Sequence, residues 1–331
     1  MNEQGLLIIP RLRVQNANCI SSPMTWGFPA ITAFTGLMVA LERKVHEHTG
    51  LEFLSVGVIC HHFAAQVTTG GYTRTFCLTR NPVDKDGSTA AIVEEGRAHL
   101  EITLVFGVAG SGMAASEEQR QQAARHCADV LATLRIAGGS VLPAEPGTPG
   151  YYQQPTLKSL SDNPDQRASE FRSLRRQWLP GFALVCRDDL LSARLHELQQ
   201  SQPEASRIDA WLDLSRLHIR PRPATEQTQA PATPATDKVE WEASRPPGWL
   251  VPIPVGFGAL SPLHQPGEVA HARDMTVPFR FVESLYSIGQ WLSPHRLQSP
   301  EQLLWYSTHD DSSGLYRCQN DYSPSHITDF A

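Results

Sequence analysis

Side chains suited to binding nucleic acid follow the first apolar run of the chain. Residues 6–9 are Leu-Leu-Ile-Ile, and the residues after them alternate with arginine before changing to amides and hydroxyls. Guanidinium groups form paired hydrogen bonds with phosphates, and amides can read the edges of bases. This pattern predicts a buried strand whose end meets a polyanion. Its candidate binding residues are Arg11, Arg13, Gln15, Asn16, Asn18, Ser21, Ser22 and Trp26.

A second set of phosphate-capable side chains surrounds a predicted hairpin. Two strand-like runs, 53–67 and 72–78, flank Thr68-Thr69-Gly70-Gly71, a sequence typical of a tight turn. Arginine mixed with threonine and asparagine is suited to fixing an RNA backbone and reading exposed base edges. A polar loop with paired threonines across the hairpin explains the composition equally well. The second set is Arg74, Arg80, Asn81 and Arg97.

Motifs for catalysis and for metal or nucleotide binding are absent from the sequence. His61 and His62 are adjacent in a predicted strand, so their side chains point to opposite faces and cannot ligate one metal ion together. A histidine packed at a strand end explains the pair better than a general base. Neither a complete phosphate-binding loop nor a G-x-S-x-G motif occurs, and the six cysteines form no C-x-x-C pair. We therefore expect no catalytic residue, no metal and no cofactor.

The overall charge is acidic, but arginines are concentrated locally. The chain has 331 residues, of which 41% are apolar, and its formal net charge of -6 argues against a protein that coats nucleic acid through bulk positive charge alone. From Arg167 to Arg187 five arginines face one acid, Glu170, and we expect a solvated helix surface there. Scattered cysteines, no signal peptide and no membrane-spanning run lead us to expect a cytoplasmic protein without a membrane partner.

Apolar spacing predicts an α+β fold for the first part of the chain. Strand, helix, two strands, a further strand, helix and strand are expected in that order, and Ser116 is expected to cap the second helix. The order is that of a ferredoxin-like unit, in which helices cover one face of an antiparallel sheet and the other face is free. RNA-recognition modules bind RNA on that free face. The strands are expected at 6–14, 53–67, 72–78, 99–108 and 134–142, and the helices at 30–48 and 117–134.

The rest of the chain is expected to form an insertion and a β-rich part. An arginine-rich helix stopped by Pro180 is predicted first, followed by a strand and two helices. Residues 220–238 are rich in Pro, Thr, Ala and Gln, a composition typical of a flexible surface loop. The prolines after Trp249 favour short edge strands that pack on the first lobe. The helices are expected at 166–178, 188–200 and 206–214, and the strand at 181–186.

Motifs along the whole chain resemble those of one protein family. They begin with Pro-Arg-Leu-Arg-Val-Gln-Asn-Ala-Asn at residues 10–18, and the others lie at 21–29, 79–82, 86–101, 137–140, 179–185, 247–254 and 291–296. With these motifs the chain closely resembles the Cas-five-family subunit of the type I-F CRISPR surveillance assembly, the Csy complex. The residues of the opening motif and of the second set are the RNA-binding candidates that we carry over from this family.

The resemblance implies both a fold and a role. The fold is α+β, with a ferredoxin-like (RRM-type) lobe at 1–145, an inserted helical, thumb-like element at 146–219, a flexible loop at 220–240 and a β-rich C-terminal part at 241–331. The implied role is non-catalytic: the subunit binds the 5' handle of the guide RNA, pairs with the large subunit and abuts the repeated backbone subunit. It thereby supports recognition of foreign double-stranded DNA near the large-subunit interface in antiviral defence.

Two other functions remain open from the sequence. Relatives with this fold in another CRISPR subtype process guide RNA, so a metal-independent endoribonuclease with His61 or His62 as base and a Lys or Tyr72 as partner is the first alternative. A pure protein adaptor with solvated basic clusters is the second. Trp26 and Phe28 could stack on bases, but we expect their Trp-Gly-Phe-Pro turn to pack in the core.

Overall fold

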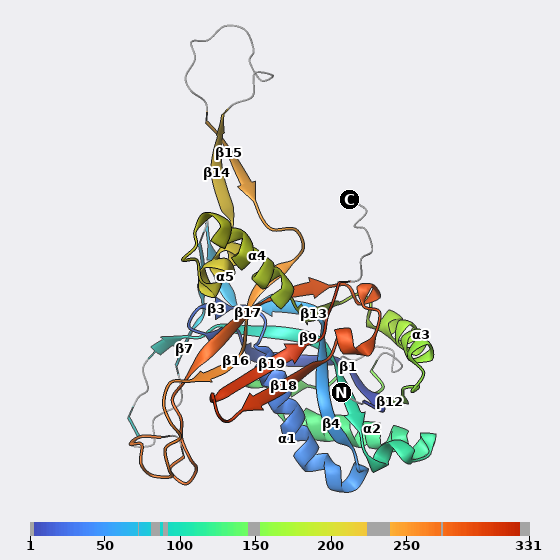
Figure 1. The fold of residues 1–331 in the computed structure, drawn as a ribbon. Coiled ribbons are helices and arrows are strands. Elements are labelled where there is room, and N and C mark those ends of the chain that lie inside the picture. The colour runs from blue at the N-terminus through green and yellow to red at the C-terminus, as the bar shows by residue number, and fades with distance from the viewer. Residues whose placement is uncertain are drawn as a thin grey trace.

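The fold is a mixed α/β arrangement built on one large antiparallel sheet. The computed structural model describes residues 3–71, 73–80, 87–88, 92–144, 153–223, 239–272 and 274–324. Within these residues eleven strands form the main sheet, and four further strand pairs lie outside it. Figure 1 shows the sheet in the middle of the molecule, with helices around it and a narrow two-stranded arm projecting from one end.

The first part of the sheet has four antiparallel neighbours in the order β11, β1, β9, β4. Helices α1 and α2 pack on one face of these strands (Figure 1). Their boundaries confirm the sequence prediction, since Gly50 in the left-handed region ends α1 and Ser116 forms a capping box with Gln119 at the start of α2. The elements are β1 (Gly5–Asn18), α1 (Ile31–Thr49), β4 (Glu52–Ala65), β9 (Arg97–Ala109), α2 (Glu117–Ala132) and β11 (Gly139–Leu142).

Two predicted elements near this sheet are different in the structure. The predicted strand 134–142 is a hairpin of β10 (Arg135–Ile136) and β11, because Ala137 and Gly138 both have positive φ and turn the chain. The predicted turn at Gly70 is confirmed, but its strands are the short pair β5 (Val67–Gly70) and β6 (Thr73–Phe76) rather than extensions of β4.

The sheet continues from β4 into the C-terminal part and returns to β4. The order is β4, β13, β17, β16, β19, β18, and Trp305 of β18 pairs with Val56 of β4 to close the cycle. Trp305 is fully buried and its Nε1 donates to the Leu184 carbonyl at 2.8 Å. At this closure the Leu303 side chain occupies the space that a Cβ at Gly57 would need. These strands are β13 (Phe182–Cys186), β16 (Leu250–Ala259), β17 (Val282–Leu292), β18 (Trp305–Asp310) and β19 (Leu315–Asn320).

The face of the sheet away from α1 and α2 is half covered, so the predicted fully free face is wrong. Leu6, Ile8 and Val105 point to this face and lie under Phe171 and Trp178. These two aromatic residues come from α3 (Pro164–Leu174) and the 3-10 helix η3 (Arg175–Trp178), which extend the predicted arginine-rich helix across the sheet. The short helices η5 (Pro294–Arg296) and η6 (Pro300–Gln302) lie at either side of Leu297, which joins the same cluster. A short edge strand, β12 (Thr156–Ser159), pairs with the start of β1.

The remaining helices support a projecting arm. Helices α4 (Asp188–Ser201) and α5 (Arg207–Ser215) occur where the sequence predicts them and pack on β17. Strands β14 (His218–Pro223) and β15 (Val239–Ser244) pair to form the arm at the top of Figure 1. The predicted loop 220–240 is therefore strand at both of its ends, and residues 224–238 lie outside the described part of the chain. No helix among the described residues is long and apolar enough to cross a membrane.

Candidate nucleic-acid interface

The uncovered half of the far sheet face is polar. One row across β11, β1, β9 and β4 consists of Leu142, Arg13, Glu101 and His62, which are register neighbours and therefore share a face. On β9, residues 97, 99, 101 and 103 are polar, whereas the alternate residues 98, 100, 102 and 104 are buried under the helices. We call this surface the polar half-face and define it as Arg11, Arg13, Gln15, His62, His99 and Glu101.

Arg11 is held by a bulge in β1. The register shifts between Ile9 and Leu12, and Arg11 has a φ of 52°, so an extra residue is accommodated opposite Thr103. The amide N–H of Arg11 donates to Thr103 Oγ1 at 3.2 Å, and its NH1 lies 2.9 Å from Glu101 Oε1. Its side chain is 21% exposed. Arg11 is thus oriented by a carboxylate, and the hydrogen bonds of the described residues occupy only one edge of its guanidinium.

A second bulge in β1 places Asn16. The register shifts again between Val14 and Ala17, and Asn16 has a φ of 60°. Its Oδ1 accepts from Gln66 Nε2 at 2.5 Å, and its carbonyl accepts from Arg97 NH1 at 3.3 Å. Asparagine tolerates this left-handed backbone better than most residues. Asn16 therefore ties β1 to its neighbours and is already hydrogen-bonded on its side chain.

Arg13 and Gln15 lie between the two bulges, on the polar half-face. Arg13 is half-buried beside Glu101. Gln15 is exposed opposite Ser140, and no hydrogen bond of its side chain occurs among the described residues. A neutral amide in this position can donate to and accept from a bound base.

The hydroxyl and amide residues after β1 stabilise a turn. Asn18 bonds both backbone groups of Ile20, and Ser21 Oγ accepts from the Ala30 N–H at 2.9 Å, just before α1. Ser22 is buried and its Oγ lies 2.6 Å from Thr25 Oγ1. These contacts shape the small hairpin of β2 (Ile20–Ser22) and β3 (Thr25–Trp26). Asn18, Ser21 and Ser22 therefore have a structural role.

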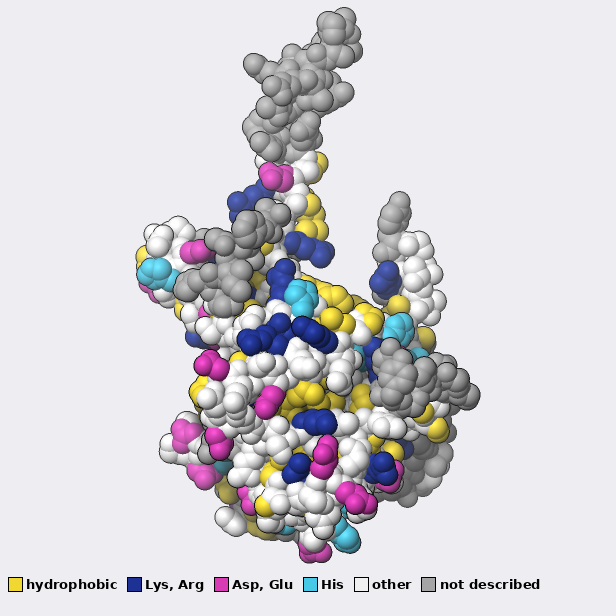
Figure 2. Space-filling view, turned by 90° about the vertical axis from the view of Figure 1, so that its right-hand side faces the viewer, with side chains coloured by type: hydrophobic (Ala, Val, Ile, Leu, Met, Phe, Trp, Pro, Cys, Tyr) yellow, Lys and Arg dark blue, Asp and Glu magenta, His cyan; other side chains and the backbone are white. Residues whose placement is uncertain are grey.

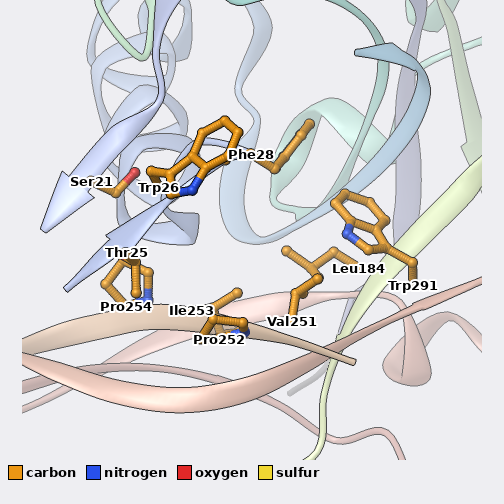
Figure 3. Close-up of a pocket in the computed structure, with 11 residues that line it drawn as sticks. Ser21, Thr25, Trp26, Phe28, Leu184, Val251, Pro252, Ile253, Pro254 and Trp291 are labelled. Atoms are coloured by element: carbon orange, nitrogen blue, oxygen red, sulfur yellow. The ribbon is translucent and has the colours of Figure 1, made fainter. Parts of the chain in front are cut away.

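Trp26 is exposed beside an apolar pocket. Its side chain is 56% exposed and touches Phe76 edge to face, so the expectation that it packs in the core is wrong. Phe28 does pack, stacked on Phe34 and edge-on to Trp291. Figure 3 shows Trp26 on one side of the pocket and β16 on the other. The cavity is about 110 Å³ and is lined by Ser21, Thr25, Trp26, Gly27, Phe28, Leu184, Val251, Pro252, Ile253, Pro254 and Trp291.

His61 is locked into a hydrogen-bond chain. Its Nε2 lies 2.8 Å from Thr103 Oγ1, and its Nδ1 lies 2.6 Å from the Pro180 carbonyl oxygen. Since a carbonyl only accepts, Nδ1 carries the proton and Nε2 accepts from the threonine hydroxyl. Burial lowers the pKa of His61, which favours this neutral form. These hydrogen bonds run from the Arg11 amide through Thr103 and His61 to the Pro180 carbonyl.

The second set of predicted residues is only partly brought together. Arg97 is ion-paired with Glu95 at 2.6 Å, and Arg74 is exposed on β6 opposite Thr69. Thr68 and Thr75 are register partners, so the paired threonines of the alternative interpretation are present. For Arg80 the structure describes the backbone, at the end of β7 (Leu78–Arg80), which pairs with β8 (Ile92–Glu94). Asn81 lies outside the described residues.

Comparison with known proteins establishes the family. The model of a family described as CRISPR-associated protein (Cas_Csy2) matches residues 7–318. The chain belongs to this family. A curated relative, CRISPR-associated protein Csy2 of Pseudomonas aeruginosa (strain UCBPP-PA14), is 47% identical over 317 residues, which cover 95% of this chain and 94% of the relative.

Family membership confirms the predicted assignment to the type I-F CRISPR system and its Csy complex. The narrower label of a Cas-five-family subunit stays a prediction. The polar half-face and the pocket beside Trp26 both lie within the residues that the family model matches.

Sequence reasoning missed the partners that hold the site together. Glu101, Thr103, His99 and Gln66 bond the predicted residues, yet none was among the candidates. Alternation along β9 could have placed the first three on one face, since their neighbours are all apolar. The described residues contain no group of three or more His, Cys, Asp or Glu that could hold a metal ion.

Proposed function

We propose that the chain is a non-catalytic, cytoplasmic subunit of the complex that binds the 5' handle of the guide RNA on the polar half-face. One observation carries this proposal: guanidinium and amide groups converge on the only half of that sheet face that the described residues leave uncovered. Single-stranded RNA is bound on such sheet faces through stacking and through contacts to phosphates and base edges.

The residues of the site have different tasks in this proposal. Arg13 and Gln15 contact the RNA directly, and Arg11 adds the edge of its guanidinium that Glu101 leaves unused. Arg97 and Asn16 hold the backbone of β1 in place. Trp26, exposed beyond the turn, stacks on a splayed base. Arg74 extends the phosphate contacts along β6.

The topology supports a ferredoxin-like lobe in the first part of the chain. Strands β11, β1, β9 and β4 are antiparallel neighbours, α1 connects β1 to β4 through the β2–β3 hairpin, and α2 leads from β9 to β11 through β10. That arrangement is a split βαβ pair on one sheet. The helices then cover one face and leave the other for the ligand.

Two separate apolar surfaces fit two protein partners. Monomeric proteins rarely leave large apolar areas in water, so such surfaces mark contacts with other chains. We assign them to the large subunit and the repeated backbone subunit, with target double-stranded DNA passing near the large subunit. One surface lies at α5 and the arm and consists of Ile208, Leu212, Leu217, Ile219, Trp241 and Trp249. The other lies on the β16–β17 connection and consists of Leu260, Leu263, Met275, Val277, Phe281 and Val282.

A catalytic role has little support from the site. Both nitrogens of His61 are engaged, so this ring cannot accept a proton from RNA without breaking its hydrogen bonds. His62 is exposed next to Glu101 and is the remaining candidate base. Incubating the purified protein with repeat RNA in EDTA should leave the RNA intact; a product that disappears in His62→Ala would instead establish the endoribonuclease.

Photo-crosslinking tests the location of the RNA. Guide RNA carrying a photoreactive uridine in its 5' handle is irradiated in the assembled complex, and the crosslinked peptides are identified. The expected peptides come from β1, β9 and the β2–β3 hairpin. Crosslinks confined to α1 and α2, on the other face of the sheet, would contradict the proposal.

A further inference from the structure

The arginine-rich element predicted to be a solvated surface presents a patch of positive charge that no carboxylate of the described residues pairs. Arg172 of α3 and Arg176 of η3 are exposed one helical turn apart, and Arg175 lies beside them. Arg296 is exposed on η5, which packs against η3. None of these four arginines forms an ion pair with a described residue. We call them the arginine patch.

The neighbouring arginines of the same stretch behave differently. Arg167 is ion-paired with Glu301 at 2.9 Å and lies 3.6 Å from Glu3, and Arg187 is ion-paired with Asp189 at 2.8 Å. Among the described residues, carboxylates therefore pair with two of the five arginines. The other three lie on α3 and η3, next to the η5 segment that carries Arg296.

The patch is held rigidly on the protein. Phe171 and Trp178 are buried under it and meet edge to face at 5.6 Å, which fixes the orientation of α3 and η3. Arg175 NH1 donates to the Leu297 carbonyl and links η3 to the η5 segment. Burial, with the charges of Arg172 and Arg176 close by, lowers the pKa of Arg175. The fold thus keeps like charges together, and an anionic ligand would relieve their repulsion.

The chemistry of the patch fits a phosphodiester backbone better than a protein. Within residues 153–178 no large apolar side chain is exposed, and the exposed Leu179 and Phe182 follow only after η3. Protein interfaces need apolar anchors at their centre. Ser173 and Gln177 are exposed among the arginines and offer further hydrogen bonds. Figure 2, which views the molecule from the side that carries α3, shows Lys and Arg side chains gathered near the middle of that face.

Hydrogen bonds also join the segment that follows the patch to the polar half-face. Leu179 and Pro180 follow η3 directly, and the Pro180 carbonyl accepts from His61 at 2.6 Å, which bonds Thr103 under Arg11.

We propose that the arginine patch binds the phosphodiester backbone of a nucleic acid, as a second site beside the polar half-face. This inference extends the proposed RNA-binding function. Its ligand is either the guide RNA beyond the handle or target double-stranded DNA, since both present the same phosphates.

The test compares two charge reversals of equal size in the assembled complex. Arg172→Glu with Arg176→Glu removes the exposed pair, and Arg43→Glu with Lys44→Glu makes the same charge change on the exposed side of α1. One arm measures guide RNA retained per complex, and the other measures affinity for target duplex DNA at several salt concentrations. If the protein with both charge reversals does not fold, the variant Arg172→Ala with Arg176→Ala, which only removes the two charges, replaces it in both arms.

The expected result is a weaker interaction in one arm for the patch variants alone. Where DNA is the ligand, the dependence of log affinity on log salt should become shallower by about 1 for each phosphate that the variant no longer binds. Where RNA is the ligand, less RNA is retained and the DNA affinity per RNA-loaded complex is unchanged. Equal behaviour of the patch variants and the α1 variant in both arms would overturn the proposal. Arg13→Glu, measured in parallel, separates failure of the patch from failure of the proposed handle site.

Discussion

Arg11 and Glu101 face each other across β1 and β9, with guanidinium NH1 2.9 Å from the carboxylate Oε1. The bulge that gives Arg11 a φ of 52° brings its side chain onto this carboxylate. Both side chains are partly exposed, so the pair contributes little to stability, but it sets the direction in which the arginine points. The pair also lowers the net positive charge that the polar half-face offers to RNA.

Glu101→Gln should strengthen binding of the handle RNA. The amide oxygen can still accept from Arg11, while the site gains one unit of positive charge. Affinity for a handle oligonucleotide should rise a few-fold, and the free energy of unfolding should fall by less than about 1 kcal/mol. Filter binding and chemical denaturation measure the two quantities. Weaker RNA binding in this variant would show that the ionised carboxylate itself is needed for the site.

His61 makes the stability of the fold depend on pH. Burial lowers its pKa from the usual 6.5, so the unfolded chain binds more protons than the folded chain between the folded-state pKa and about pH 6.5. The free energy of unfolding therefore falls as pH drops through this window. His61→Gln should lose less stability between pH 7.5 and 5.5 than the wild type does, as measured by melting temperature. An identical loss in both proteins would be inconsistent with a buried, neutral His61.

Trp26 and Phe28 should separate RNA binding from folding. Trp26→Ala removes an exposed ring, so the free energy of unfolding should change by about 1 kcal/mol or less, while RNA affinity drops roughly tenfold because base stacking is removed. Phe28→Ala should cost about 2 kcal/mol or more because the ring packs between Phe34 and Trp291. If Trp26→Ala retains full RNA affinity, the indole has no role in the RNA site.

Gly57 should be required where the sheet closes on itself. A Cβ at this position would lie 2.5 Å from Leu303 Cγ, so Gly57→Ala overpacks the closure and should cost about 1–3 kcal/mol. Gly36→Ala on α1 is the matched control, since nothing lies within 4 Å of its Cβ and it is exposed in a helix. That control should gain roughly 0.5–1 kcal/mol. A destabilised Gly36→Ala with an unaffected Gly57→Ala would rule out this account of the closure.

Local patterns predicted the helices and central strands well. The apolar spacing of α1, the Ser116 cap of α2 and the long apolar run of β9 each depend on neighbours in sequence. What the sequence did not reveal depends on contacts between distant segments. The covering of the sheet by Phe171 and Trp178 and the pairing of Trp305 with Val56 are of this kind.

The candidate site was predicted by residue type but not by geometry. Arginine, glutamine and asparagine in the opening motif do lie on or beside the polar half-face. The two bulges that give Arg11 and Asn16 positive φ carry no glycine, so the sequence offers no sign of them. The sequence predicts Ser21 and Ser22 as ligand contacts, whereas their hydroxyls bond the protein itself, because short polar residues after a strand serve turns as readily as ligands.

Guide RNA content of complexes carrying Arg13→Glu with Gln15→Ala tests the central claim most directly. Arg43→Glu with Gln122→Ala, at exposed positions on the helix side of the sheet, is a control with the same change in charge. We predict that the variant in β1 loses most of its guide RNA while its melting temperature stays close to that of the wild type, and that the control retains its RNA. Full retention of guide RNA by a correctly folded β1 variant would contradict the assignment of the polar half-face as the handle-binding site.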